Sequence, residues 1–181
     1  QATMAMVSGD LNGDGYPDLI AGNHGQPDRI YFNNGTAHPF RGVIGADIPT
    51  DMTYTRSLAL GDMDGDGDTD LIAGPYGQPN QLWLNNGTSD PFNEVEPVYI
   101  TEDTHQTCSV ALADADGDGD LDIAVGNDGE VNRLYLNNGT AHPFKEVSGT
   151  DITGETDMTR SLIFTDINGD GAPDLLAGNN G

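Results

Sequence analysis

The chain has 181 residues and a formal net charge of −24, because only 6 lysines and arginines oppose its 30 acidic residues. Nucleic acid and anionic membrane surfaces are poor partners for such a chain, since binding to either relies on clustered Lys and Arg. No segment approaches the roughly 18 consecutive apolar residues of a membrane helix, so we expect no membrane insertion.

Four acidic loops recur along the chain, and each begins 52 residues after the one before. They read Asp10-Leu-Asn-Gly-Asp-Gly-Tyr-Pro-Asp18, Asp62-Met-Asp-Gly-Asp-Gly-Asp-Thr-Asp70, Asp114-Ala-Asp-Gly-Asp-Gly-Asp-Leu-Asp122 and Asp166-Ile-Asn-Gly-Asp-Gly-Ala-Pro-Asp174. A constant period with one loop per unit indicates a repeat protein. We predict a single array of units at about 1–52, 53–104 and 105–156, with a partial unit at 157–181.

Short apolar segments in each unit are typical of β-strands, because they are rich in β-branched and aromatic residues and bounded by Gly, Asn and Pro. One precedes the acidic loop, at 57–60, 109–112 and 161–164. A second follows the loop at once, at 70–73, 122–125 and 174–177. A third is expected at 29–32, 81–84 and 133–136, and a weaker fourth at 40–44, 92–95 and 144–147. No sustained 3.6-residue period indicates a helix.

Asn-Gly pairs follow the third strand, at 34–35, 86–87 and 138–139. They predict tight hairpin turns, because Asn and Gly readily adopt the positive φ that such turns need. Four antiparallel strands per unit, at a period near 50, describe a β-propeller blade. We therefore predict an all-β fold: a β-propeller segment of four-stranded antiparallel blades, with about 3.5 blades of a 52-residue repeat.

The acidic loops have the composition of calcium sites, because Ca²⁺ takes six to eight oxygen ligands and needs a tightly turning backbone. Positions 1, 3, 5 and 9 always carry a side-chain oxygen, and position 6 is always Gly. Position 7 tolerates Ala, so its ligand is expected to be the backbone carbonyl. The predicted ligands of about four Ca²⁺ ions, one per loop, are Asp10, Asn12, Asp14, Tyr16, Asp18, Asp62, Asp64, Asp66, Asp68, Asp70, Asp114, Asp116, Asp118, Asp120, Asp122, Asp166, Asn168, Asp170, Ala172 and Asp174.

These loops are not EF-hands. An EF-hand loop needs a bidentate Glu at position 12, where this chain has only apolar residues: Ala21, Ala73, Val125 and Ala177. We interpret calcium as a structural staple of each blade, with the alternative that it also contacts or gates a ligand. Mg²⁺ fits less well, because it prefers few protein ligands and retained waters.

The Asp-x-Asp/Asn-x-Asp-Gly-x-x-Asp signature, followed by a strand of the Asp-Leu-Ile-Ala-Gly type, resembles the integrin-α-type FG-GAP/VCBS repeat family. The resemblance spans the chain and implies a propeller whose calcium loop joins the first and second strands of a blade. A literal Phe-Gly…Gly-Ala-Pro string is absent, and Ile72-Ala73-Gly74-Pro75 is the nearest match. Members of this family are mostly extracellular adhesion, lectin-like or scaffold modules, which implies an extracellular or cell-surface location.

No catalytic constellation is evident, because every close cluster of Asp already belongs to an acidic loop. Cys108 takes the repeat position of Arg56 and Arg160, no recurring His or basic neighbour is evident, and we expect an incidental thiol. We predict a non-catalytic binding, adhesion or scaffold domain. The alternatives are a carbohydrate-binding, lectin-like propeller with sugars held between blades, and an accessory module of a larger secreted enzyme.

The chain contains about 3.5 repeat units, and this incomplete number predicts that the propeller is completed by another chain or by more of the same chain. An open propeller arc exposes apolar blade faces and unpaired strand edges, which invite association. We expect either a homodimer or the remainder of a longer propeller chain, and the absence of an initiator Met before Gln1 fits a processed chain or a piece of something longer. The expected ligand is a protein or a glycan.

Overall fold

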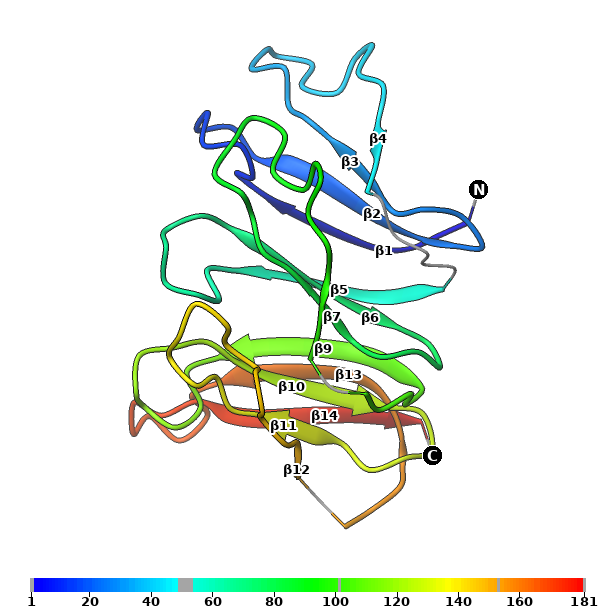
Figure 1. The fold of residues 1–181 in the computed structure, drawn as a ribbon. Coiled ribbons are helices and arrows are strands. Elements are labelled where there is room, and N and C mark those ends of the chain that lie inside the picture. The colour runs from blue at the N-terminus through cyan, green and yellow to red at the C-terminus, as the bar shows by residue number, and fades with distance from the viewer. Residues whose placement is uncertain (1, 49–53, 101, 153, 181) are drawn as a thin grey trace.

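The computed structural model describes residues 2–48, 54–100, 102–152 and 154–180. Within these ranges the chain forms strands and turns, and no helix is present that would be long and apolar enough to cross a membrane. Three four-stranded antiparallel sheets are followed by a two-stranded sheet (Figure 1). The all-β, blade-like architecture predicted from the repeat is therefore confirmed.

Each sheet is a meander in which strands pair in chain order. The first blade contains β1 (Ala2–Gly9), β2 (Asp18–His24), β3 (Arg29–Tyr31) and β4 (Ala46–Asp47). The second contains β5 (Thr55–Gly61), β6 (Asp70–Pro75), β7 (Gln81–Trp83) and β8 (Val98–Tyr99). The third contains β9 (Thr107–Ala113), β10 (Asp122–Asn127), β11 (Arg133–Tyr135) and β12 (Thr150–Asp151). The fourth sheet consists of β13 (Met158–Thr165) and β14 (Asp174–Asn180).

The fourth strand of each blade is not where the sequence predicts it. The segments 40–44, 92–95 and 144–147 contain turns and no strand, and the fourth strands are the two-residue β4, β8 and β12. Phe92 and Phe144 are buried, but they lie in these turns. The sequence predicts strands here because Phe92 and Phe144 are apolar, but these residues fill contacts between blades from within turns.

The Asn-Gly pairs also differ from the prediction. Gly87 does have a positive φ of 69°. It lies, however, in the long loop that joins β7 to β8, and not in a tight two-residue turn. The Asn86 amide donates to the carbonyl oxygens of Asp90 and Asn93, both at 3.2 Å, and folds the loop back on itself. Side-chain bonds to nearby backbone thus replace the predicted two-residue turn.

The blades stack face to face, and the core lies between them. One cluster joins the first and second blades, where buried Ile20 and Ile30 meet Leu71 and Trp83. A second cluster joins the second and third blades around Ile72, Leu82, Ile123 and Tyr135. The first strands of the blades, β1, β5, β9 and β13, contact one another in that order (Figure 1).

A β-bulge interrupts the first strand of every blade at the same repeat position. A bulge leaves one residue outside the ladder and redirects its side chain. The residues set outside the ladder are Met4, Arg56, Cys108 and Arg160.

Candidate metal centres

The four acidic loops join the first and second strands of the four sheets. All four lie along one edge of the array, at the left in Figure 1. The strand pairs hold both ends of each loop: in the second blade, for example, Gly61 pairs with Asp70. Repetition of the blade therefore places four chemically similar loops on one side of the molecule.

The first aspartate of each loop holds the backbone in a tight turn. Asp62 Oδ1 accepts a hydrogen bond from Gly65 N at 2.8 Å, and Asp62 Oδ2 accepts one from Gly67 N at 3.0 Å. Gly67 has a φ of 95°, which an L-residue with a Cβ rarely adopts. The same contact to position 6 is made from Asp10, Asp114 and Asp166.

The last aspartate of the loop anchors it to the segment that follows the third strand. Asp70 is buried and accepts hydrogen bonds from Met63 N at 2.8 Å and from Asn85 N at 2.7 Å. Burial raises the pKa of Asp70 to about 6, against the opposing effect of these two hydrogen bonds. Burial likewise raises the pKa values of Asp18 and Asp122, which occupy the same position. A carboxylate held in this way is poorly solvated and favours a cation beside it.

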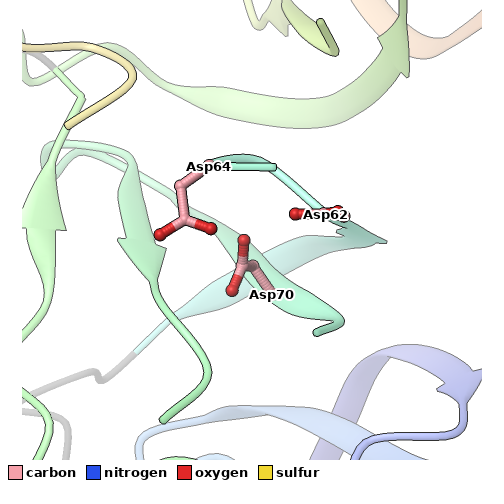
Figure 2. Close-up of side chains that lie close together, drawn as sticks. All are labelled: Asp62, Asp64 and Asp70. Carbon is pink, nitrogen blue, oxygen red and sulfur yellow. The ribbon is translucent and has the colours of Figure 1, made fainter. Parts of the chain in front are cut away.

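Two loops bring three carboxylates close together in the described part of the chain. Figure 2 shows Asp62, Asp64 and Asp70 directed toward a common space, and one oxygen from each lies within 4.8 Å of the others. Asp114, Asp116 and Asp118 form the second such group. Hard carboxylate oxygens around a tight glycine turn fit a hard divalent cation such as Ca²⁺.

The remaining predicted ligands are not gathered as closely in the described residues. The first and fourth loops carry Asn12 and Asn168 at position 3 and form no group of three carboxylates at this spacing. Their backbone hydrogen bonds nevertheless match those of the other loops, since Asn12 Oδ1 accepts from Asp14 N at 3.0 Å and Asn168 Oδ1 from Asp170 N at 2.8 Å. All four loops therefore share one backbone turn.

Position 7 side chains lie against the Asn-Gly segment of their own blade. A Cβ on Gly87 would lie 2.8 Å from Asp68 Oδ2, and a Cβ on Gly139 would lie 2.7 Å from Asp120 Oδ2. The ring of Tyr16 packs on Gly35 in the same manner. This placement supports the interpretation that position 7 offers its backbone carbonyl to a cation.

The family assignment rests on the same loops. The FG-GAP-like repeat family matches residues 10–73, 62–125 and 114–177. The chain belongs to the FG-GAP-like repeat family. Each match begins at the first Asp of one loop and ends beyond the next loop, so the family repeat contains this geometry. No curated protein matches the sequence.

Asn85, which directly precedes the Asn-Gly pair at 86–87, links successive loops of this FG-GAP-like array. Asn85 Nδ2 donates to Thr69 O of its own loop at 3.0 Å and to Leu11 O of the preceding loop at 2.9 Å. Asn137 Nδ2 makes the equivalent bond to Met63 O at 2.8 Å. Recurrence of Asn at 33, 85 and 137 was the available signal.

The expectation that Cys108 has no basic neighbour is wrong. Arg56 Nη1 lies 3.4 Å from Cys108 Sγ, and Arg160 Nη1 lies 3.5 Å from it. Successive members of this group are 52 residues apart in the sequence, and the bulges place their side chains next to one another on adjacent first strands. The Arg56 guanidinium also lies 4.0 Å from the centre of the Tyr76 ring. Chain spacing alone could not show this, because the contact needs neighbouring FG-GAP-like blades to align.

A groove of about 760 Å³ separates the outer parts of the second and third FG-GAP-like blades. Exposed Tyr99 and buried Phe144 provide apolar walls, and Asp103, Arg133 and Lys145 provide charged ones. The corresponding hollow between the first and second blades is only about 150 Å³. These two contacts between blades therefore differ in the space that they leave open.

Proposed function

We propose that this chain is a calcium-binding, non-catalytic binding or scaffold module in which one Ca²⁺ ion per acidic loop stabilises each blade. The observation that carries the proposal is the convergence of Asp62, Asp64 and Asp70 within 4.8 Å. No ion pair between described residues supplies these carboxylates with Lys, Arg or His, so a cation from solution is needed to offset their repulsion.

The loop residues have distinct parts in this proposal. The side chains at positions 1, 3, 5 and 9 and the position 7 carbonyl supply oxygen ligands, and the aspartate at position 9 also ties the site to the segment that follows the third strand. Bound Ca²⁺ supplies charge neutralisation and no chemistry of its own. FG-GAP repeats are typically non-catalytic and occur in extracellular or surface proteins. Extracellular calcium modules commonly have dissociation constants of about 10⁻⁴–10⁻³ M.

Thermal unfolding tests the calcium proposal. The melting temperature should rise with calcium concentration, because an ion that binds only the folded state stabilises it by mass action. Mg²⁺ at the same concentration should raise it less, since Mg²⁺ retains its waters. Equal melting temperatures in excess EDTA and in millimolar calcium would refute the proposal.

A lectin-like function is the second candidate, and the groove between the second and third blades favours it. Tyr99 offers an exposed ring on which a sugar can stack, and Asp103, Arg133 and Lys145 offer polar partners at the same groove. Glycan arrays probed in calcium and in chelator would detect this activity. Binding that is lost in Tyr99→Ala and retained in Ile44→Ala, an exposed apolar control outside the groove, would support it.

A further inference from the structure

Asn-Gly pairs occur in two kinds of loop within the described residues. Three follow the third strands, at 34–35, 86–87 and 138–139, and two lie in acidic loops, at 12–13 and 168–169. Asparagine deamidates most readily before glycine, because glycine has no Cβ to hinder attack by its own backbone nitrogen. The reaction needs that nitrogen to be free and the side-chain amide to leave. The reactivity of each pair therefore depends on how the fold holds these two groups.

The pairs after the third strands have their glycine nitrogen engaged. Gly87 N donates a hydrogen bond to Asn85 Oδ1 at 3.0 Å. The equivalent nitrogens of Gly35 and Gly139 donate to the asparagine two residues before them at 2.9 Å and 3.0 Å. A nitrogen held in this way must first lose its hydrogen bond before it can attack a side-chain carbonyl.

The side-chain amides of these pairs are engaged as well. Asn138 Nδ2 donates to His142 O at 3.1 Å and to Lys145 O at 3.2 Å. Asn86 Nδ2 makes the same two contacts, and Asn34 Nδ2 makes longer ones, at 3.3 Å and 3.5 Å. Their acceptors are backbone carbonyls four and seven residues further along the chain. Loss of ammonia from these asparagines therefore requires the whole loop to open.

The pair in the first acidic loop has a free nucleophile. Gly13 N has no hydrogen-bond partner among the described residues. In the other three acidic loops the equivalent nitrogen donates to the first aspartate at 2.7–2.8 Å, and Gly169 of the second acidic-loop pair is one of these donors. In the first loop, Asp10 Oδ1 accepts instead from Asp14 N, at 3.2 Å. Asn12-Gly13 thus differs from every other pair in these loops.

The Asn12 amide is also held only locally. Its Nδ2 donates to Asp14 Oδ2 at 3.2 Å, in a solvent-exposed bond between residues two apart. Its Oδ1 accepts from Asp14 N at 3.0 Å, but Asn86 Oδ1 accepts from Thr88 N at the same distance, so this contact does not distinguish the two kinds of pair. Gly13 is exposed, and a Cβ built there would have no atom within 4 Å. The space around its nitrogen is therefore open.

We propose that Asn12 is a deamidation site of this chain, selected over the other Asn-Gly pairs because the fold leaves the Gly13 nitrogen free. Gly13 N attacks Asn12 Cγ, so that an N–Cγ bond forms and the Cγ–Nδ2 bond breaks. Ammonia leaves with the two amide hydrogens and the proton that Gly13 N gives up. Water then opens the cyclic imide at either of its carbonyls, which gives aspartate or isoaspartate at position 12.

The aspartate product would change the charge of the first loop. It adds a carboxylate to Asp10, Asp14 and Asp18, so that the loop gains the acidic residues that the second loop has at positions 1, 3, 5 and 9. It also replaces the hydrogen bond from Asn12 Nδ2 to Asp14 Oδ2 with repulsion between two carboxylates. Any effect of this charge on calcium binding rests on the proposed function, whereas the deamidation itself does not.

Site-resolved deamidation rates test the proposal. The full chain is aged in EDTA below its melting temperature, where circular dichroism shows it folded, and separately in urea, and the mass gain of each tryptic peptide is followed. Cleavage after Lys and Arg places Asn12, Asn34, Asn86 and Asn138 in four different peptides. The ratio of the folded to the unfolded rate removes the effect of local sequence. Asn12 should keep most of its unfolded rate, whereas the other three should be slowed roughly tenfold or more, because their hydrogen bonds must break first.

Two variants test the reason for this selectivity. Asn33→Ala removes the acceptor of Gly35 N, so the folded rate at Asn34 should rise severalfold while the rate at Asn86 stays unchanged. Asn12→Asp should co-elute with one product of the aged chain on anion exchange and should melt below the wild type in EDTA. Equal rate ratios at Asn12 and at the other three asparagines would overturn the proposal, and so would an unchanged rate at Asn34 in Asn33→Ala.

Discussion

The buried aspartate at position 9 holds the backbone and, under the proposed function, also faces a cation. Asp70 accepts two backbone hydrogen bonds that favour its ionised form, while burial disfavours that form and dominates. A divalent cation at Asp62 and Asp64 would offset the cost of burying the charge. Asp70 is therefore a structural anchor of the loop, and under the proposed function a bound cation would stabilise its ionised form.

Calcium stabilisation should depend on position 5 more than on position 7. Asp66→Ala and Asp118→Ala remove predicted ligands, whereas Asp68→Ala removes a side chain that lies against Gly87. With a dissociation constant of about 0.1 mM and about 1 mM free calcium, losing one site should cost about 1.4 kcal/mol. Chemical denaturation in calcium and in EDTA measures this difference. Equal losses in Asp66→Ala and in the Asp68→Ala control would contradict the assigned roles.

The pH dependence of the metal-free protein should follow the pKa of Asp70, which burial raises from its ordinary value of 3.8 to about 6. Between these values the native state holds more protons than the unfolded state, so the free energy of unfolding falls as pH rises. The contribution of Asp70 to the free energy of unfolding is fully present below pH 3.8 and is lost above about pH 6. The stabilisation that calcium adds to the folded state should become smaller as pH falls through about 6, because protons compete with the metal for Asp70.

Melting in EDTA and in calcium across this range tests the sign of the effect. Asp70→Asn serves as the control, because it cannot titrate and should flatten the metal-free slope. A metal-free protein whose melting temperature climbs between pH 4 and pH 6, the range bounded by the two pKa values, would contradict the expectation.

At the scale of the element, the second and third acidic loops are each tied both to their own blade and to the loop of the blade before. The amide of Asn85 bonds Leu11 O and Thr69 O, which belong to successive loops. Its backbone N–H bonds Asp70. The first three loops are therefore a connected row, and a cation in one of them should stiffen the contact with the next.

Asn85→Ala should destabilise the protein more than Asn33→Ala. Asn85 is buried, and its loss leaves two carbonyl oxygens without their donor, at about 1–3 kcal/mol for a buried polar group. Asn33 holds the same repeat position but donates only to Pro17 O of its own loop, in a solvent-exposed bond. Urea unfolding of both variants measures the difference. A cost for Asn33→Ala as large as for Asn85→Ala would show that the link between blades contributes nothing.

The elements that the sequence predicts best are those with their own local signal. Strands 57–60 and 70–73 lie inside β5 and β6, because their apolar composition and the flanking acidic loop mark both. The fourth strand was misplaced because Phe92 is buried by the neighbouring blade while lying in a turn. The pair of arginines beside Cys108 was missed for a related reason, since bulges and blade stacking create it. A contact that forms only when two blades pack together has no sequence pattern within either blade that would predict it.

At the scale of the whole molecule, the net charge of −24 is the main electrostatic burden on folding. Self-repulsion destabilises a compact state. Four Ca²⁺ ions would lower this charge to −16, and they would do so where the carboxylates are closest together. Under the proposed function, bound metal would therefore offset the repulsion among the carboxylates along the acidic edge of the array.

Calcium stoichiometry tests this account most directly. Equilibrium dialysis of the chelator-stripped chain against millimolar calcium, with metal measured by mass spectrometry, should give four ions per chain, one for each loop. The triple variant Asp62→Ala, Asp64→Ala, Asp66→Ala should lose one ion and keep the other three. A folded chain that binds no calcium under these conditions, or a triple variant that binds as many ions as the wild type, would contradict the account.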